Sequence, residues 1–139
     1  MRMRMNVDEL ERREPAARSW LNQAAELAVA WGVCSADGRR READVRAVRI
    51  VAARIWQMTR GQPSFAAIDT DGTHEDLTEA FVGASRVADA LRVVFRLYWM
   101  LAQRGVVSDA LAAEVQTELY RLYRDEQHKV RRRRARVAG

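Results

Sequence analysis

Apolar residues recur at helical spacing over most of the chain, and the first such run predicts a helix that begins near Pro15. Proline has a fixed φ angle that suits the first turn of a helix. The apolar positions that follow alternate four and three residues apart and share one helical face: Trp20, Ala24, Leu27, Trp31 and Cys34. The sequence Ser35–Gly38 is typical of a turn, so the helix is expected to end there.

A second helix is predicted from about Glu42 to Arg60, because Gly61 favours a helix end and the apolar residues before it share one arc. That arc consists of Val45, Val48, Val51, Ala52, Ile55 and Met58. Ile50 falls outside it, which suggests contact with a partner. Residues 61–76 form a predicted loop, in which Thr73 and Asp76 resemble the capping box of the next helix.

The clearest pattern belongs to a third helix of about thirty residues, which corresponds to a length of about 45 Å. It carries two neighbouring apolar stripes that run between Leu77 and Ala102. A helix with two apolar stripes is expected to lie at the centre of a bundle. Gly83 is expected to weaken this helix locally, and Arg104 with Gly105 suits its end.

A fourth helix is predicted to begin with Ser108 or Asp109 as its cap and to fade into the arginine run near Arg131. Its core stripe consists of Leu111, Val115, Leu119 and Leu122. The fold class is therefore predicted to be all-α, an antiparallel bundle of about four helices with a long central third helix. We assign residues 1–14 to a polar N-terminal arm, which forms either a short polar helix or a frayed segment. Residues 15–130 are assigned to the bundle and 131–139 to a basic C-terminal tail.

Composition limits the classes to which such a bundle can belong. The chain has 139 residues, of which 48% are apolar and 31% charged, which fits one compact domain and excludes a disordered chain. Its single cysteine excludes an internal disulfide and favours a reducing compartment. No apolar run has the length of a membrane span, and the N-terminus lacks the apolar block of a signal peptide. We therefore expect a soluble, cytoplasmic protein that does not bind a membrane.

The net charge of +5 conceals a strong segregation of charge along the chain. Every basic residue except Lys129 is an arginine. Residues 36–60 carry seven bases and three acids, residues 61–79 five acids and no base, and residues 130–139 five bases and no acid. The chain is thus expected to present two basic helical faces, an acidic loop and a basic tail, which favours a polyanionic partner.

The basic zones supply the candidate binding residues. Guanidinium groups bind phosphate in a bidentate manner and stack on bases, so helices that display arginine at one-turn intervals suit a nucleic-acid backbone. Trp56, beside the first zone, is the candidate for stacking on a base. The candidate nucleic-acid-binding residues are Arg39, Arg46, Arg49, Arg60, Arg86, Arg92, Arg96, Arg131, Arg132, Arg133 and Arg134. The alternative is a merely solvated face and a disordered tail, in a chain whose coding sequence favours arginine.

Other patterns that suggest chemistry fail on spacing or context. Asp69–Gly72 resembles part of a calcium loop, but the twelve-residue register places no carboxylate at the first and last ligand positions. His74 is expected to be exposed at a helix start, and the pair Asp125–Glu126 to be solvated. Cys34 is expected to be a small core residue rather than a nucleophile. We therefore predict that the protein is not an enzyme and that it binds neither a metal ion nor another cofactor.

The combination of small size, helical content and basic faces resembles the small helical subunit of multisubunit CRISPR–Cas effector complexes. The resemblance covers most of the chain but includes no short motif, so it assigns no functional residue. It implies a non-catalytic scaffold subunit of a ribonucleoprotein that contacts RNA or single-stranded DNA, contacts other protein subunits and stacks side by side with copies of itself. The acidic segment Asp69–Glu79 is then expected to face a basic region of a neighbour.

Two other functions are compatible with the same sequence. The first is a helical protein-interaction adaptor without nucleic-acid binding, which would use Ile50, Trp99 or Tyr120 as hydrophobic contacts. The second is a DNA-binding regulator, because Glu26–Val33 resembles the first helix and turn of a helix-turn-helix motif. Asp37–Gly38 interrupts that motif where a recognition helix should begin.

Overall fold

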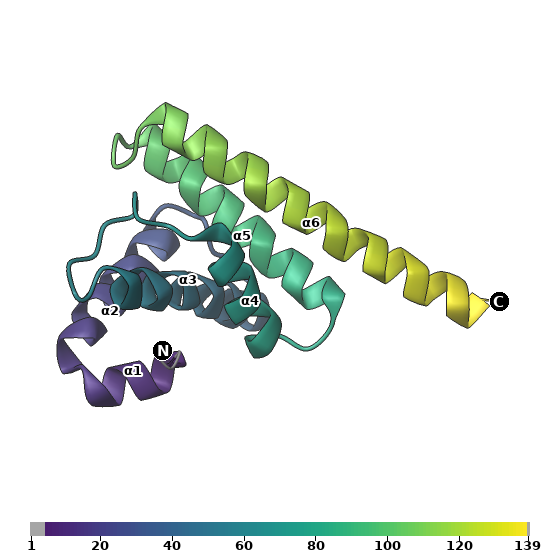
Figure 1. Ribbon diagram of the computed structural model, residues 1–139, viewed down its shortest axis with the longest axis horizontal. Coiled ribbons are helices and arrows are strands. Elements are labelled where there is room, and N and C mark those ends of the chain that lie inside the picture. The colour runs from purple at the N-terminus through teal and green to yellow at the C-terminus, as the bar shows by residue number, and fades with distance from the viewer. Residues whose placement is uncertain (1–4, 139) are drawn as a thin grey trace.

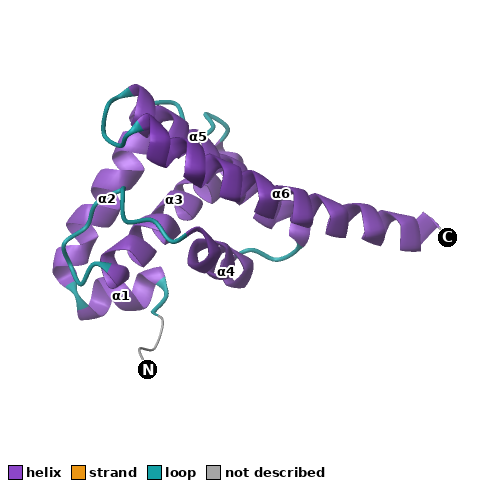
Figure 2. Ribbon diagram, turned by 45° about the horizontal axis from the view of Figure 1, so that its top comes forward, coloured by secondary structure: helices purple, strands orange, loops and turns teal. Residues whose placement is uncertain are grey.

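The computed structural model describes residues 5–138, which fold into six α-helices and contain no β-strand (Figure 2). The helices are α1 (Val7–Arg13), α2 (Pro15–Ala30), α3 (Gly38–Met58), α4 (Thr70–Ala80), α5 (Ala84–Gln103) and α6 (Asp109–Ala138). The all-α class is confirmed, whereas the prediction of a bundle of about four helices is wrong. The first four residues of the predicted N-terminal arm, and Gly139, lie outside the described residues.

The six helices are arranged around α3 and α5. α5 and α6 lie side by side and antiparallel, α3 and α4 pack against α5, and α1 and α2 pack against α3 (Figure 1). α6 has 30 residues and α5 has 20, and the C-terminal end of α6 continues past the start of α5 and projects from the body. The predicted tail is therefore the end of a helix.

The N-terminal arm contains a helix because its first turn is capped and one apolar side chain is available for the core. The Asn6 side chain accepts a hydrogen bond from the backbone N–H of Glu9 at 2.9 Å. Leu10 is fully buried, although the residues around it in α1 are mostly charged. Leu10 thus anchors this polar segment in the core, and the ion pair of Glu11 with Arg49 of α3 adds a second connection to the bundle.

The predicted third helix is two helices, because the chain turns at residues 81–83. Gly83 has φ +94° and ψ 148°, a backbone conformation that glycine adopts almost alone. The apolar periodicity continues across this turn because Leu77 in α4 and Phe81 after it are buried in the same core as the face of α5. The spacing of apolar residues alone therefore could not distinguish two helices joined by a turn from a single long helix.

Several helix ends follow from local capping. Pro15 begins α2 and the Ser108 Oγ accepts from the backbone N–H of Leu111 at 3.1 Å, so these two predictions are confirmed. α3 begins four residues earlier than predicted, because the Asp37 side chain caps it. α4 begins inside the predicted loop, because the Asp69 Oδ1 accepts from the backbone N–H of Gly72 at 3.1 Å. The predicted capping box is therefore not the start of this helix.

The segment between α3 and α4 is part of the core, although its sequence is polar. Phe65 is buried, and its backbone carbonyl accepts a hydrogen bond of 2.6 Å from the hydroxyl of the fully buried Tyr98. The Trp20 ring lies 4.8 Å from the Phe65 ring, between centroids, and the Trp20 Nε1 donates to the Ala52 carbonyl at 2.7 Å. These contacts connect the loop to α2, α3 and α5.

Candidate nucleic-acid interface

The four predicted arginines of the α3 region (Arg39, Arg46, Arg49 and Arg60, here the α3 stripe) do not form one free surface. Arg39 and Arg46 are exposed on α3, and the Arg46 guanidinium carbon lies 5.1 Å from the centroid of the Phe81 ring. Arg49 is half-buried, and its guanidinium binds the carboxylate of Glu11 and donates to the Asn22 Oδ1 at 2.8 Å. The Arg49 guanidinium is thus bound by other side chains of the protein, which indicates a structural role.

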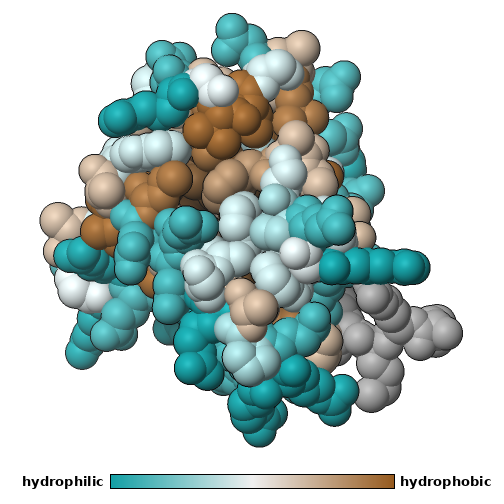
Figure 3. Space-filling view, turned by 90° about the vertical axis from the view of Figure 1, so that its left-hand side faces the viewer, coloured by the Kyte–Doolittle hydropathy of each residue, from teal (hydrophilic) through white to brown (hydrophobic). Residues whose placement is uncertain are grey.

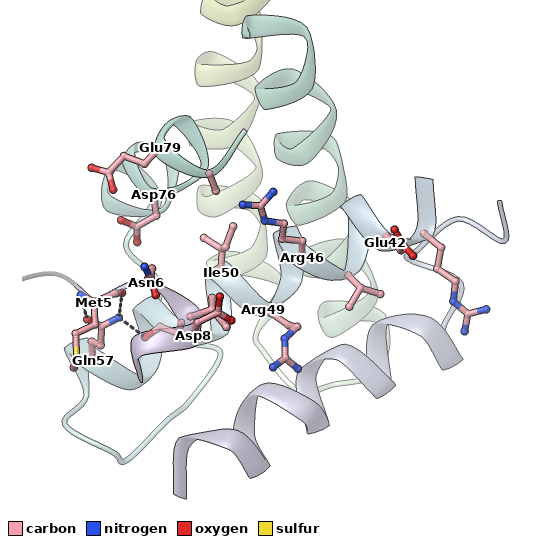
Figure 4. Close-up of a pocket in the computed structure, with 15 residues that line it drawn as sticks. Met5, Asn6, Asp8, Glu42, Arg46, Arg49, Ile50, Gln57, Asp76 and Glu79 are labelled. Carbon is pink, nitrogen blue, oxygen red and sulfur yellow. Dashed lines mark hydrogen bonds between the residues drawn. The ribbon is translucent and has the colours of Figure 1, made fainter. Parts of the chain in front are cut away.

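The side chains around Arg46 and Arg49 line a cavity of about 770 Å³ between α1, α3 and α4 (Figure 4). Asp76 and Glu79 of α4 lie on the opposite side of this cavity from Arg49 in the figure. Because its walls carry both signs of charge, the cavity is not a specifically basic surface. Ile50 also lines it and is only 6% exposed, so the prediction that Ile50 contacts a partner from an open surface is not supported by its burial.

The predicted arginines of α5 differ among themselves in the same way. Arg86 and Arg92 are exposed. The Arg96 guanidinium donates to the Val33 carbonyl at 3.2 Å and lies 3.9 Å from the Asp44 carboxylate, so it ties α5 to the segment between α2 and α3. Asp89, which lies between Arg86 and Arg92 in the sequence, is 4.0 Å from Arg40 of α3. Of this set, Arg86 and Arg92 are therefore the members available to a ligand.

Trp56 is not a surface for base stacking. Its ring is 9% exposed, and its Nε1 donates to the Glu14 carboxylate at 3.3 Å. Trp99, by contrast, is 52% exposed, and it follows Arg92 by seven residues and Arg96 by three along α5. Such spacing places all three on one helical face. Trp99 is therefore an exposed aromatic residue beside arginine, although the sequence predicts for it only a role in protein contacts.

The arginines of the C-terminal segment are fully displayed. Residues Arg131–Arg134, here the α6 arginine run, and Arg136 are all exposed on the projecting end of α6. No acidic residue follows Glu126 in the chain. The predicted tail residues thus retain both their charge and their exposure, on a helical scaffold.

The side chain that sequence reasoning missed is Glu126. It is 2% exposed, and its Oε1 lies 2.8 Å from the His74 Nε2 and 3.1 Å from the Lys129 Nζ. The expectations that His74 is exposed and that Glu126 is solvated are therefore wrong. The signal was available, because Glu126 follows Leu119 by seven residues and Leu122 by four and so continues the core stripe of α6.

Cys34 and the residue types that bind metal ions are the remaining candidates for chemistry. Cys34 is buried, and burial, with a smaller contribution from the Asp44 carboxylate, raises the pKa of its thiol to about 11. A thiol with a raised pKa is a weak nucleophile at neutral pH. Within residues 5–138, no three side chains of the His, Cys, Asp and Glu types gather in a way that could hold a metal ion.

Comparisons with known proteins add no family. No protein-family model matches the chain, and neither a curated protein nor a solved structure shows significant similarity to it. Among the helices of the described part of the chain, none is both long and apolar enough to cross a membrane.

Proposed function

We propose that the protein is a non-catalytic, cytoplasmic scaffold subunit of a ribonucleoprotein, and that α6 binds the phosphate backbone of RNA or single-stranded DNA. The observation that carries the proposal is the exposure of the α6 arginine run on a helix end that projects from the body. The run and Arg136 place five guanidinium groups within about 9 Å of helix axis.

The electrostatics of this helix end favour a polyanion. Like charges at such spacing repel each other, and the described residues provide no ion pair to the α6 arginine run. A nucleic-acid backbone supplies phosphates at regular intervals and releases its condensed counterions when arginine replaces them. The expected binding is therefore strong at low salt and weakens steeply as the salt concentration rises.

A preference for single strands is supported by the exposed face of α5. Arg92 and Trp99 share that face. The bases of a single strand can stack on an exposed aromatic ring, whereas the bases of a duplex are already paired and stacked on one another. On α6, Tyr120 is 55% exposed and its ring stacks with that of Tyr123 at 6.4 Å between centroids. Exposed aromatic rings near arginines are typical of surfaces that bind single strands.

Membership of a multisubunit complex is part of the same proposal. The small size, the helical content and the basic helix end support the resemblance to small subunits of CRISPR–Cas effector complexes. Side-by-side stacking of copies would bring successive α6 ends to one side and extend the basic surface. Purification of the natively expressed protein tests this part, because co-purifying subunits and nucleic acid are both expected.

The binding test uses fluorescence anisotropy with a 3′-labelled single-stranded 30-mer at several salt concentrations. The triple substitution Arg131→Gln, Arg133→Gln and Arg134→Gln should lower the affinity and reduce the salt slope by about two, at about 0.7 for each lost phosphate contact. The control is the triple substitution of the exposed residues Arg12, Arg13 and Arg18 by Gln, which changes the net charge equally. Equal losses in the two triple variants would overturn the assignment to α6.

The alternative function is a protein-interaction adaptor. Apolar side chains gather on the end of the molecule that carries the α5–α6 turn (Figure 3), where Val106 is 50% exposed. Absence of any binding by the wild type at low salt would favour this alternative. A strong preference for one duplex over random duplex would instead favour the helix-turn-helix regulator, with α3 as the reading helix.

A further inference from the structure

A second concave surface lies where α6 passes over the turn between α4 and α5. It is a cavity of about 380 Å³. One side is formed by α6 and the other by the end of α4, the turn and the start of α5. The lining residues that matter for its chemistry are Gly83, Ala84, Lys129, Arg132, Arg133 and Arg136.

Four cations of α6 converge on this cavity. Lys129, Arg132, Arg133 and Arg136 follow one another at intervals of three, one and three residues, which places them on one side of the helix. Lys129 is paired with the buried Glu126 at 3.1 Å. The three arginines form no ion pair with any residue of the described chain. The cavity therefore has an excess of positive charge that protein groups leave unbalanced.

The one carboxylate at the cavity does not cancel this excess. Glu126 is almost fully buried, and its Oε1 is engaged by both the His74 Nε2 and the Lys129 Nζ. Its effect is to hold Lys129 against the wall of the cavity. The arginines, whose side chains extend from the exposed part of α6, remain available to an anion.

The start of α5 adds hydrogen-bond donors to the same space. Gly83 and Ala84 line the cavity, and α5 begins there without a side-chain cap and without an acid in its first turn. The first N–H groups of a helix have no partner within the helix, and the helix dipole is positive at this end. These groups supplement the arginines, which carry most of the charge.

The remaining wall is mostly apolar, with Thr78 as its one polar side chain. Phe81 and Val87 are buried beside the cavity, and the Arg46 guanidinium covers the Phe81 ring at 5.1 Å from its centroid. An apolar wall next to a strongly basic one suits a ligand with a phosphate at one end and an uncharged part at the other. An inorganic ion would leave that wall unused.

We propose that this cavity binds a phosphate monoester, as carried by the 5′ end of a nucleic-acid strand or by a free nucleotide. A monoester near neutral pH carries close to two charges and three oxygens that accept hydrogen bonds, whereas a backbone diester carries one charge. Three arginines on one small cavity match the monoester better. As a 5′-end site, the inference rests on the proposed nucleic-acid function and adds recognition of the strand terminus.

The test compares two otherwise identical 3′-labelled single-stranded RNAs, one with a 5′-phosphate and one with a 5′-hydroxyl. The wild type should bind the phosphorylated strand about tenfold more tightly, which corresponds to one strong charge-assisted contact. The double variant Arg132→Gln and Arg136→Gln should bind both strands equally. The matched control, Arg131→Gln and Arg134→Gln on the same helix but outside the cavity, should weaken both strands and keep their ratio.

The outcomes separate this inference from the proposed function. Equal affinity of the wild type for the two strands overturns the cavity assignment and leaves backbone binding intact. If neither strand binds, the proposed function fails, and calorimetry with a nucleoside monophosphate decides the cavity by itself. If the wild type and the Arg131/Arg134 control bind the nucleoside monophosphate and the Arg132/Arg136 variant does not, a free nucleotide is supported as the ligand. If the wild type does not bind the nucleoside monophosphate, the inference is overturned. All four substituted positions are exposed, so the variants should melt at the wild-type temperature.

Discussion

The Nε2 of His74 lies 2.8 Å from the Oε1 of Glu126, and this contact joins α4 to α6 at a place where the carboxylate is almost fully buried. The same oxygen accepts from Lys129, so one acid organises two cationic or polar side chains. Buried carboxylates are costly unless such partners satisfy them. The orientation of the basic helix end relative to α4 therefore depends on Glu126.

Replacement of Glu126 by Ala should destabilise the fold, because it leaves His74 without its partner and opens a cavity under α6. The free energy of unfolding should fall by about 2–3 kcal/mol, measured by urea titration. The neighbouring Asp125→Ala, at an exposed position, is the control and should change stability little. A Glu126→Ala variant as stable as the control would show that the buried contact contributes nothing.

The turn between α4 and α5 should be specific for glycine. Gly83→Ala places a side chain at φ +94° and ψ 148°, and should lower the free energy of unfolding by about 1–3 kcal/mol. No atom lies within 4 Å of the Cβ that alanine would add at Gly83 or at Gly38, so neither substitution causes a steric clash, and only the one at Gly83 requires a positive φ. The control is Gly38→Ala, at the first residue of α3, which should be neutral or stabilising. Both variants are measured by thermal or urea denaturation.

Cys34 should make stability depend on pH in the alkaline range. Burial raises the thiol pKa from 9.0 to about 11, so the folded state retains a proton that the unfolded chain has lost between these values. The contribution of the protonated thiol to the free energy of unfolding is complete below pH 9. It declines as the pH rises, by up to about 1.4 kcal/mol per pH unit. Unfolding free energies of wild type and Cys34→Ala, measured from pH 8 to 10.5, should therefore converge or cross. Parallel curves would contradict the prediction.

Substitutions of Arg49 and Arg39 should distinguish a structural arginine from a surface arginine on α3. Arg49→Ala removes the close ion pair with Glu11 and the hydrogen bond to Asn22, and should lower the free energy of unfolding by about 1–2 kcal/mol. Arg39→Ala removes a charge from an exposed position and should leave stability nearly unchanged. The comparison is made by urea denaturation at two salt concentrations. Similar stabilities of the two variants would mean that the half-buried ion pair between Arg49 and Glu11 is not a structural contact.

The sequence was sufficient for the class of fold and for the helix faces, because burial imposes a period that single residues reveal. It failed at residues 81–83, where Phe81 continues the apolar stripe although the backbone turns. At α1, the sequence allowed a short polar helix but did not indicate that Leu10 enters the core. In both places, the deciding information is which distant residues complete the core, and a local pattern does not contain it.

The candidate site was predictable only where charge and exposure coincide. The α6 arginine run lies beyond the last core residue of the helix, so its exposure follows from the absence of apolar neighbours. Arg49 has partners that lie 27 and 38 residues away in the chain, and nothing in the local sequence indicates them. Exposed Trp99 and buried Trp56 likewise differ through the helices that pack around them.

The projecting end of α6 has a consequence for how far the protein reaches. Every side chain from Arg131 to Ala138 is exposed, so tertiary packing contributes little to the order of this segment. Its helical form depends on intrinsic propensity and on the favourable position of cations near a helix C-terminus, against repulsion between pairs such as Arg132 and Arg136. Counterions or bound phosphates reduce that repulsion. We therefore expect the helical length of α6 to depend on its ionic surroundings, and a polyanion that lies against its end would favour the longest helix.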